Sequence, residues 1–401
     1  MTNHEDSIDF GNGQPSLSLL PVDALRTAAA HCLARGDATL LQYGADQGDA
    51  EFRVSLAQFL SRRYAMPVRA DELMVSGSAS QALDLVCTRF TKPGDTIFVE
   101  EPTYFLALHV FRDHGLQVVG IPIDGDGIQV DALRDALMRH RPELLYTIPS
   151  FQNPSGATMS AARRVQLMAL SREYDLLVVA DEVYHLLDFG TAPPPPLAAH
   201  ASAHASALAS ALASAHAAST RVLSLGSFSK ICAPGLRLGW IHGAPALLDT
   251  LMDSGLVQSG GGLNPFTSGV MRSMIDLGLA DAGLDQLRAV YTERAAVMCR
   301  TLRDELPMVT FVAPSGGYFV WVELPPSMTA AQLQPVAAKE GVTLHAGSRF
   351  ISRIGFTQHM RLSFAHYDVA DLVDGVHRLA RAVRLERDGL SRQTGRAIAR
   401  R

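Results

Sequence analysis

The stretch Gly226-Ser-Phe-Ser-Lys-Ile-Cys-Ala-Pro-Gly-Leu-Arg-Leu-Gly-Trp240 decides the fold of this chain. It follows Val222–Leu225, the last of several short apolar runs that predict buried strands. The other expected strands are Thr96–Val99, Gln117–Ile121, Leu144–Ile148 and Leu176–Ala180, and they alternate with helical spacing at Glu51–Tyr64, Ser80–Phe90, Val130–His140 and Ala161–Tyr174. This alternation predicts βαβ units around a largely parallel sheet, in which ligands bind beyond the carboxyl ends of the strands.

One of only three lysines in the chain stands inside this stretch. Lys230 is flanked by the hydroxyls of Ser227 and Ser229 and is followed by Arg237. A buried lysine amine forms Schiff bases with carbonyl compounds and also acts as a base, whereas two serines and an arginine suit a phosphate. A carbonyl and a phosphate on one cofactor indicate pyridoxal phosphate; the alternative is a structural lysine in a Ser/Gly turn.

Two further motifs end predicted strands, Val178-Val-Ala-Asp-Glu-Val-Tyr184 and Phe151-Gln-Asn-Pro-Ser-Gly156. With these motifs the chain, from about Ile8 to Leu379, resembles a fold-type-I pyridoxal-phosphate-dependent aminotransferase of class I/II. Its pattern is similar to that of the kynurenine/2-aminoadipate aminotransferase group. The resemblance implies the aspartate-aminotransferase-like α/β fold: a large domain with a mostly parallel seven-stranded sheet sandwiched by helices, and a smaller α+β domain.

The implied domain order places an N-terminal arm at 1–40, as part of the small domain, before the cofactor-binding domain at 41–280. The small C-terminal domain follows at 281–385. A four-residue repeat of alanine and serine at 198–219 looks like a solvent-exposed insertion. Its His200 and His204 are spaced for a shared metal, but the exposed insertion is the favoured reading, and no metal site is predicted. Residues 386–401 are polar and Arg-rich, and we expect a disordered tail.

The resemblance also assigns roles around the cofactor ring. Asp181 pairs with the pyridine nitrogen and so stabilises the electrons that the ring accepts. Tyr184 and Asn153 hydrogen-bond the ring's phenolic oxygen, and the bond from Asn153 to the following proline is of a kind that is often cis in this family. Tyr104, in Glu100-Glu-Pro-Thr-Tyr104, stacks on the ring face.

The phosphate contacts come from two further places. Val75-Ser-Gly-Ser-Ala-Ser-Gln-Ala-Leu83 leads from a strand into a helix, whose N-terminus suits an anion. Within it the resemblance assigns Ala79 and Ser80; family members often carry a glutamine where Ser80 stands, so backbone contacts are the firmer expectation. Ser227, Ser229 and Arg237 complete the set, and Tyr43 reaches the phosphate of the neighbouring subunit, which implies a homodimer.

Substrate recognition is expected from the small domain and the N-terminal arm. Arg361, in His359-Met-Arg-Leu-Ser-Phe364, grips the α-carboxylate of the amino acid through a planar, bidentate guanidinium. Asn153 touches the same carboxylate. Gly13 lies in Gly11-Asn-Gly-Gln-Pro15, a segment that resembles the family's substrate cover and that is read equally well as a simple turn.

Composition narrows the class of protein. The 401 residues are 47% hydrophobic and 19% charged, which suffices for a large core and argues against disorder. A net charge of −5 gives no sign of nucleic-acid binding. The four cysteines are scattered, the N-terminus is polar and acidic, and no apolar run is long enough to span a bilayer, so we expect a cytoplasmic protein without a membrane partner.

The expected activity is transfer of an amino group from an L-amino acid to a 2-oxo acid by a ping-pong Schiff-base mechanism. A pyridoxal-phosphate-dependent lyase or cyclising synthase of the same fold is an open alternative, because the motifs do not separate these reactions. A cofactor-sensing regulator is a further alternative, but such proteins carry a winged-helix module ahead of the aminotransferase-like half. About 40 residues precede Tyr43, too few for that module.

Overall fold

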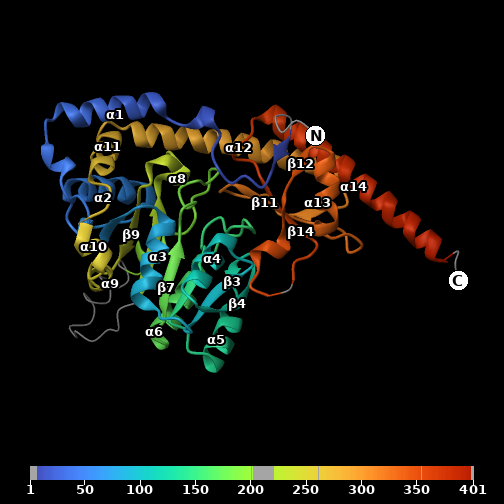
Figure 1. The fold of residues 1–401 in the computed structure, drawn as a ribbon, viewed down its shortest axis with the longest axis horizontal. Helices are drawn as coiled ribbons and strands as arrows, with labels where there is room; N and C mark the ends of the chain where they lie inside the picture. Colours follow the sequence, from blue (N-terminus) through green and yellow to red (C-terminus); the bar gives the residue numbers. More distant parts are fainter. Residues whose placement is uncertain (1–6, 200, 202–220, 261, 354, 399–401) are drawn as a thin grey trace.

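The large sheet of the computed structural model has eight strands in the order β2-β9-β8-β7-β6-β3-β4-β5. These are β2 (Leu73–Ser76), β9 (Gly239–Gly243), β8 (Val222–Ser227), β7 (Leu177–Asp181), β6 (Leu144–Thr147), β3 (Thr96–Glu101), β4 (Gln117–Asp124) and β5 (Gly127–Ile128). The strands from β8 to β4 run parallel, whereas β9 is antiparallel to both β8 and β2. The structure describes residues 7–199, 201, 221–260, 262–353 and 355–398 (Figure 1).

Helices cover both faces of the large sheet. The face covered by α3 (Ala79–Phe90), α4 (Phe105–Asp113) and α9 (Pro245–Met252) forms one apolar cluster, and the face covered by α5 (Val130–Arg139) and α6 (Ala161–Glu173) forms another. Every residue of β6, β7 and β8 is buried, which explains why these strands read as continuous apolar runs. Polar side chains therefore gather where the strands end.

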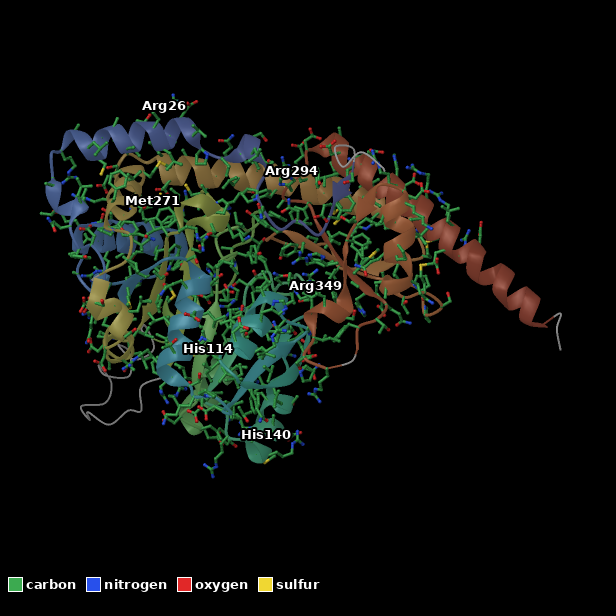
Figure 2. All side chains as sticks on the ribbon, viewed as in Figure 1. Arg26, His114, His140, Met271, Arg294 and Arg349 are labelled. Atoms are coloured by element: carbon green, nitrogen blue, oxygen red, sulfur yellow. The ribbon has the colours of Figure 1, made fainter. Side chains whose placement is uncertain are left out.

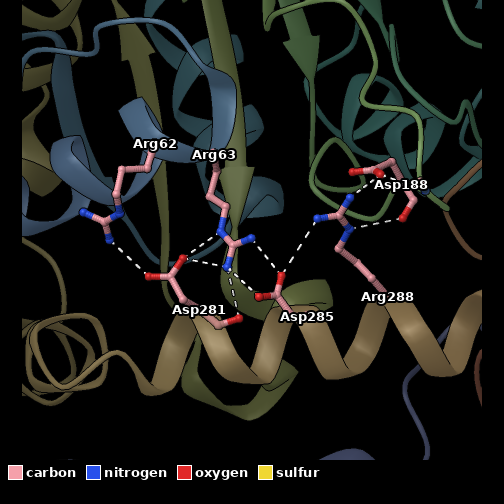
Figure 3. Close-up of polar contacts among 7 residues, drawn as sticks. Arg62, Arg63, Asp188, Asp281, Asp285 and Arg288 are labelled. Atoms are coloured by element: carbon pink, nitrogen blue, oxygen red, sulfur yellow. Dashed lines mark hydrogen bonds and ion pairs between the residues drawn. The ribbon is translucent and has the colours of Figure 1, made fainter.

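A 27-residue helix, α12 (Leu279–Glu305), runs from the large sheet to the C-terminal part of the chain (Figure 1). The other helices on this side are α1 (Val22–Ala34), α2 (Ala50–Tyr64), α8 (Phe228–Ile231), α10 (Gly255–Gly260) and α11 (Pro265–Asp276). Figure 3 shows how charges fix α12: Arg63 of α2 pairs with Asp281 at 2.7 Å and with Asp285 at 2.8 Å, and one to two turns further on Arg288 pairs with Asp188. The last pair ties α12 to the loop that follows β7.

A small sheet forms the C-terminal part, in the order β10-β11-β14-β13. Its elements are β10 (Thr310–Phe311), β11 (Phe319–Glu323), β13 (His345–Ala346) and β14 (His359–Ser363), with α13 (Ala330–Lys339) and α14 (Val369–Ile398) beside them. The N-terminal β1 (Ile8–Asp9) pairs in parallel with β12 (Val342–Thr343), so the start of the chain packs against the small sheet. Arg294 of α12 donates to Ser16 Oγ at 3.2 Å beneath this N-terminal segment (Figure 2).

The predicted strands and helices of the parallel region are confirmed, and two expectations change. The large sheet has eight strands instead of seven, because the two-residue β5 pairs with β4 at the edge. The expected tail is helical instead of disordered as far as Ile398, since α14 continues without a break through a segment rich in strong helix formers. Residues 200 and 202–220, which hold most of the Ala/Ser repeat, lie outside the described residues, whereas the domain boundaries stay a prediction.

None of the described helices is both long and apolar enough to cross a membrane.

Candidate active site

A cavity of about 430 Å³ lies beyond the carboxyl ends of β3, β6, β7 and β8. Most of the predicted site residues line it: Ala79, Ser80, Tyr104, Asn153, Asp181, Tyr184, Ser227, Ser229, Lys230 and Arg237. Gln14, from the N-terminal segment, and Ser78, directly before α3, line it as well and were not predicted. The edge of the sheet at which the cavity lies is the one expected for a ligand of a parallel sheet.

Lys230 extends into this cavity from the single helical turn α8, which begins where β8 ends. Directly before this turn, Gly226 lets the Trp240 indole pack against the end of β8, because a Cβ at Gly226 would lie 2.0 Å from that indole. The Lys230 amine donates to the carbonyl oxygen of Gly13 at 2.8 Å. Burial lowers the pKa of Lys230 to about 8; Arg361 and Arg237 lower it as well, whereas Asp181 raises it. About one-tenth of this amine is therefore neutral, and nucleophilic, at pH 7.

Asp181 is the last residue of β7 and is 8% exposed. Tyr146, on the neighbouring strand β6, donates its hydroxyl to Asp181 Oδ2 at 2.7 Å, whereas Oδ1 has no hydrogen-bond partner in the described part of the chain. Burial raises the pKa of this carboxyl, and the Tyr146 hydroxyl acts against that shift. A buried carboxylate oxygen that lines a cavity without a partner fits a protonated ring nitrogen.

An anion cradle lies at the start of α3. Arg237 Nη2 donates to Ser78 Oγ at 2.6 Å, and Ser227 Oγ lies 2.9 Å from Ser229 Oγ. Arg237 has a left-handed backbone (φ 46°), which turns the chain between α8 and β9. Hydroxyls, a guanidinium and the N-terminal amides of a helix are the groups that bind phosphate, so the cradle fits the phosphate of pyridoxal phosphate.

Arg361 lies on β14 of the small sheet and is 3% exposed. Its Nη1 donates to Asn153 Oδ1 at 2.9 Å and its Nη2 to the carbonyl oxygen of Gly11 at 2.7 Å, while its guanidinium lies 4.0 Å from the Phe319 ring centroid. Burial lowers the pKa of Arg361 to about 10, so it remains a cation at neutral pH. Asn153 thus joins the small sheet to the cofactor cavity.

Two of the predicted tyrosines, Tyr104 and Tyr184, also line the cavity. Burial raises the pKa of Tyr104 to about 12, and burial also raises that of Tyr184, so both are neutral donors. The Asn153–Pro154 bond is cis, as expected for this motif. Tyr43 is 83% exposed and does not line the cavity, so its contact with a neighbouring subunit stays a prediction.

Two residues that the sequence reasoning missed support the predicted ones. Tyr146 holds Asp181, and Tyr318 donates its hydroxyl to the carbonyl oxygen of Lys230 at 2.9 Å. Tyr146 stands near the end of an otherwise apolar strand next to the strand of Asp181, which is a usable signal. Tyr318 lies 88 residues from Lys230 in sequence, and its local pattern points only to a strand.

The chain is similar to known proteins along most of its length. The family model "Aminotransferase class I and II" matches residues 5–379. The 2-aminoadipate transaminase of Thermus thermophilus is 33% identical over 96% of this chain and 92% of its own length. The aromatic-amino-acid aminotransferase 1 of Thermococcus litoralis is 31% identical over 95% of this chain and 89% of its own.

A solved structure of similar shape carries the cofactor skeleton. The α-aminoadipate aminotransferase of Thermus thermophilus, complexed with N-(5′-phosphopyridoxyl)-L-leucine, has a TM-score of 0.84 to this chain at 32% identity. The match covers 95% of this chain and 93% of that one.

Proposed function

This chain belongs to the class I and II aminotransferase family, and we propose that Lys230, Asp181 and Arg361 carry out its amino-group transfer. The enzyme moves an amino group from an amino acid to a 2-oxo acid and uses pyridoxal 5′-phosphate. The observation that supports the residue assignment is one cavity that joins a reactive lysine, a carboxylate oxygen without a partner and an anion cradle. These three features match the aldehyde, the ring nitrogen and the phosphate of a single cofactor.

Each group of the chain has a defined task in this proposal. When bound, pyridoxal phosphate supplies a ring that accepts the electron pair left when the Cα–H bond of the substrate breaks. Asp181 Oδ1 would hold the ring nitrogen and keep it protonated, and Tyr146, which donates to Oδ2, orients that carboxylate. Lys230 Nζ, whose pKa is lowered to about 8, would take the proton from the substrate Cα and pass it to the aldehyde carbon of the cofactor, so that the proton does not return to Cα.

Arg361 orients the substrate for this proton transfer. Its guanidinium presents two parallel N–H groups, one now donating to Asn153 and one to the carbonyl oxygen of Gly11. A substrate carboxylate replaces the neutral acceptor Gly11 O by a charged one, which makes the hydrogen bond stronger. In this proposal the carbonyl oxygen of Gly11 gives up its hydrogen bond to Arg361 when the substrate carboxylate binds.

We infer a substrate with an apolar or aromatic side chain. Leu83, Leu106, Ala107 and Val110 form one wall of the cavity, beside Tyr104. Among the described residues that line the cavity, the only cations are Lys230 and Arg237, and both already have a task. A second carboxylate on the substrate therefore has no cationic partner in this wall.

The substrate proposal is tested with the donor half-reaction alone. Leucine, phenylalanine, aspartate and 2-aminoadipate are added to the cofactor-loaded enzyme without an oxo acid, and the loss of the visible absorbance is followed. We expect leucine and phenylalanine to react with the largest kcat/KM. Fastest reaction with aspartate or 2-aminoadipate contradicts the assignment of the apolar wall.

The same mixtures separate transfer from the alternative reactions. An aminotransferase releases one 2-oxo acid per cofactor and then stops until an acceptor oxo acid is added. A lyase or cyclising synthase turns over repeatedly without an acceptor. Product formation that stops at one equivalent supports transamination, and continuous formation overturns it.

We also propose that the enzyme is a homodimer. Three large apolar side chains in two neighbouring segments are strongly exposed: Leu41 (74%), Tyr43 (83%) and Leu256 (63%). Gly44 pairs with Gly262, which brings the segment of Tyr43 next to that of α10 and α11. Single exposed side chains are common, but a patch of this kind indicates an interface.

A cytoplasmic location is part of the proposal. All four cysteines are free and buried, which suits a reducing compartment. Fractionation of cells that express the full chain tests the location, and recovery outside the cytoplasm contradicts it.

A further inference from the structure

Two tyrosines flank the reactive lysine, and a third packs against one of them. The Lys230 amine lies 5.4 Å from the ring centroid of Tyr318 and 5.9 Å from that of Tyr184. The Tyr318 ring packs on Tyr184 at 5.3 Å and on Tyr291 of α12 at 5.0 Å between centroids. Tyr291 and Tyr318 are completely buried. Of these residues only Tyr184 is assigned to the cofactor, so the other two have no role yet.

Tyr318 is joined to the main chain of Lys230 by a hydrogen bond. Its hydroxyl donates to the Lys230 carbonyl oxygen at 2.9 Å and lies 3.3 Å from the Tyr291 hydroxyl. Helix α8 has only four residues, so its last carbonyls lack partners within the helix. The Tyr318 hydroxyl supplies one of the missing donors, and Tyr291 in turn donates to Tyr318.

The main chain of Tyr318 is itself fixed on two sides. The preceding Gly317 has a φ of +75°, which favours glycine, and its amide donates to the carbonyl oxygen of Leu187 at 2.9 Å. The carbonyl oxygen of Tyr318 accepts from the amide of Phe364 at 3.1 Å. Leu187 belongs to the loop after Tyr184, and Phe364 directly follows β14, which carries Arg361.

The small sheet therefore reaches the reactive lysine through one side chain. β11 begins directly after Tyr318 and pairs with β14 in a register that sets Trp321 opposite Arg361. Arg361 thus stands on β14, Tyr318 directly precedes the strand paired with it, and Lys230 stands on α8, which follows β8 of the large sheet. The hydrogen bond between the Tyr318 hydroxyl and the Lys230 carbonyl oxygen is thus a direct link between the main chain of Lys230 and the segment that leads into the small sheet.

We propose that Tyr318 is a positioning residue for Lys230, which holds the main chain of this lysine against the small sheet and so sets the place of its amine relative to Arg361. The inference rests on the proposed function of Lys230. A lysine side chain has four flexible bonds, so a fixed main chain and aromatic walls are what confine its amine. Misplacement of a reacting group by about 1 Å costs on the order of a hundredfold in rate, which makes such confinement valuable.

The competing explanation is that Tyr318 only fills the core. Tyr291 provides the matched control, because it is as deeply buried, belongs to the same ring cluster and also carries a hydroxyl. Tyr318→Phe removes the hydroxyl that contacts Lys230 and keeps the ring. Tyr291→Phe removes a hydroxyl from the same cluster and leaves the contact between Tyr318 and Lys230 intact.

The first measurement is steady-state kinetics of both variants. We expect Tyr318→Phe to lower kcat about tenfold with KM changed less than about twofold, because the hydrogen bond acts on the base and not on substrate binding. Tyr291→Phe should retain kcat within about twofold. Equal kcat values for the two variants overturn the proposal.

The second measurement needs neither cofactor nor substrate. Because the chain holds only Lys92, Lys230 and Lys339, cofactor-free protein labelled with ¹³C at the lysine ε-carbon gives three signals, and Lys230→Arg identifies the one of interest. In Tyr318→Phe the Lys230 amine is less confined and reaches solvent, so the pH midpoint of its signal should rise by about half a unit toward the ordinary lysine pKa. Tyr291→Phe should leave it unchanged.

Support requires both results. A loss of kcat with an unchanged Lys230 signal, or a changed signal with full kcat, overturns the positioning role of Tyr318. Failure of the proposed function looks different: Lys230→Ala then keeps its turnover, whatever the Tyr318 variants do.

Discussion

Lys230 should become nucleophilic near pH 8, well below the pH at which an ordinary lysine does. Burial lowers the pKa of its amine from 10.5 to about 8, with Arg361 and Arg237 acting in the same direction and Asp181 against it. The neutral form is the nucleophile, so the rate of reaction with an aldehyde rises with pH and levels off above the pKa. The pH at which it levels off therefore reports the environment of this one side chain.

The size of the effect follows from the two pKa values. At pH 7 an amine with a pKa of about 8 is roughly one-tenth neutral, whereas one with a pKa of about 10.5 is neutral in about one molecule in 3,000. Cofactor-free enzyme should thus form its Schiff base with pyridoxal phosphate about 300-fold faster than an equal concentration of N-acetyl-lysine amide does. Stopped-flow absorbance between pH 6 and 11 measures both rates.

Two variants test the cause of the shift. Asp181→Asn removes a charge that raises the pKa of Lys230, so the midpoint of the rate profile should fall further. Arg361→Gln removes a charge that lowers the same pKa, so the midpoint should rise. General loosening of the site would expose the amine and raise the midpoint in both variants. A wild-type rate that keeps rising to pH 10.5, or a rise in Asp181→Asn, refutes the electrostatic reasoning.

Three further changes test other parts of the structure. Arg237→Gln should weaken pyridoxal phosphate binding about 10- to 100-fold in equilibrium dialysis, because a guanidinium is lost from the anion cradle; the exposed Arg26→Gln should not, and equal affinities contradict the cradle. Arg164→Met should lower the free energy of unfolding by about 3 kcal/mol, because Arg164 is 1% exposed and its loss leaves Glu182 buried without a cation. Denaturant titration measures this, and a change below about 0.5 kcal/mol contradicts it. Leu41→Glu should convert the dimer to monomers in sedimentation, and a monomeric wild type disproves the interface.

The sequence predicted the chemistry of the cavity because each key residue follows a strand that is easy to recognise. Asp181 ends β7, Lys230 follows β8, and Asn153 and Tyr104 come shortly after β6 and β3. Parallel strands bring their carboxyl ends to the same edge of a sheet, so residues far apart in sequence meet there. The family resemblance then added roles that spacing alone does not give.

The residues that support the site were not predictable in the same way. Tyr146 reaches Asp181 from the neighbouring strand, and Tyr318 reaches Lys230 from the segment that leads into the small sheet. The position of Tyr146 near the end of an apolar strand is a usable signal, whereas the contact of Tyr318 depends on how the small sheet packs against the large domain, which leaves no local pattern. Gln14 lines the cavity for a similar reason, because β1 pairs with a distant strand and carries the segment after it over the site.

The end of α14 and the short strand β5 were also not predictable from the local sequence pattern. The long helix α14 continues beyond the point where its apolar pattern weakens. Once a helix has formed, each further residue adds a backbone hydrogen bond, so a helix extends without an apolar face to bury. The edge strand β5 has two residues, too few for any periodicity to appear.

Lys230 is the residue through which we propose that this enzyme holds its cofactor and transfers amino groups. The most direct test of this proposal is the visible absorbance of purified enzyme reconstituted with pyridoxal phosphate, in the wild type and in Lys230→Ala, before and after addition of an amino acid. We expect a Schiff-base band in the wild type that disappears with the amino acid, and no such protein-bound band in Lys230→Ala. A Lys230→Ala protein that keeps the band and still transfers the amino group contradicts the account.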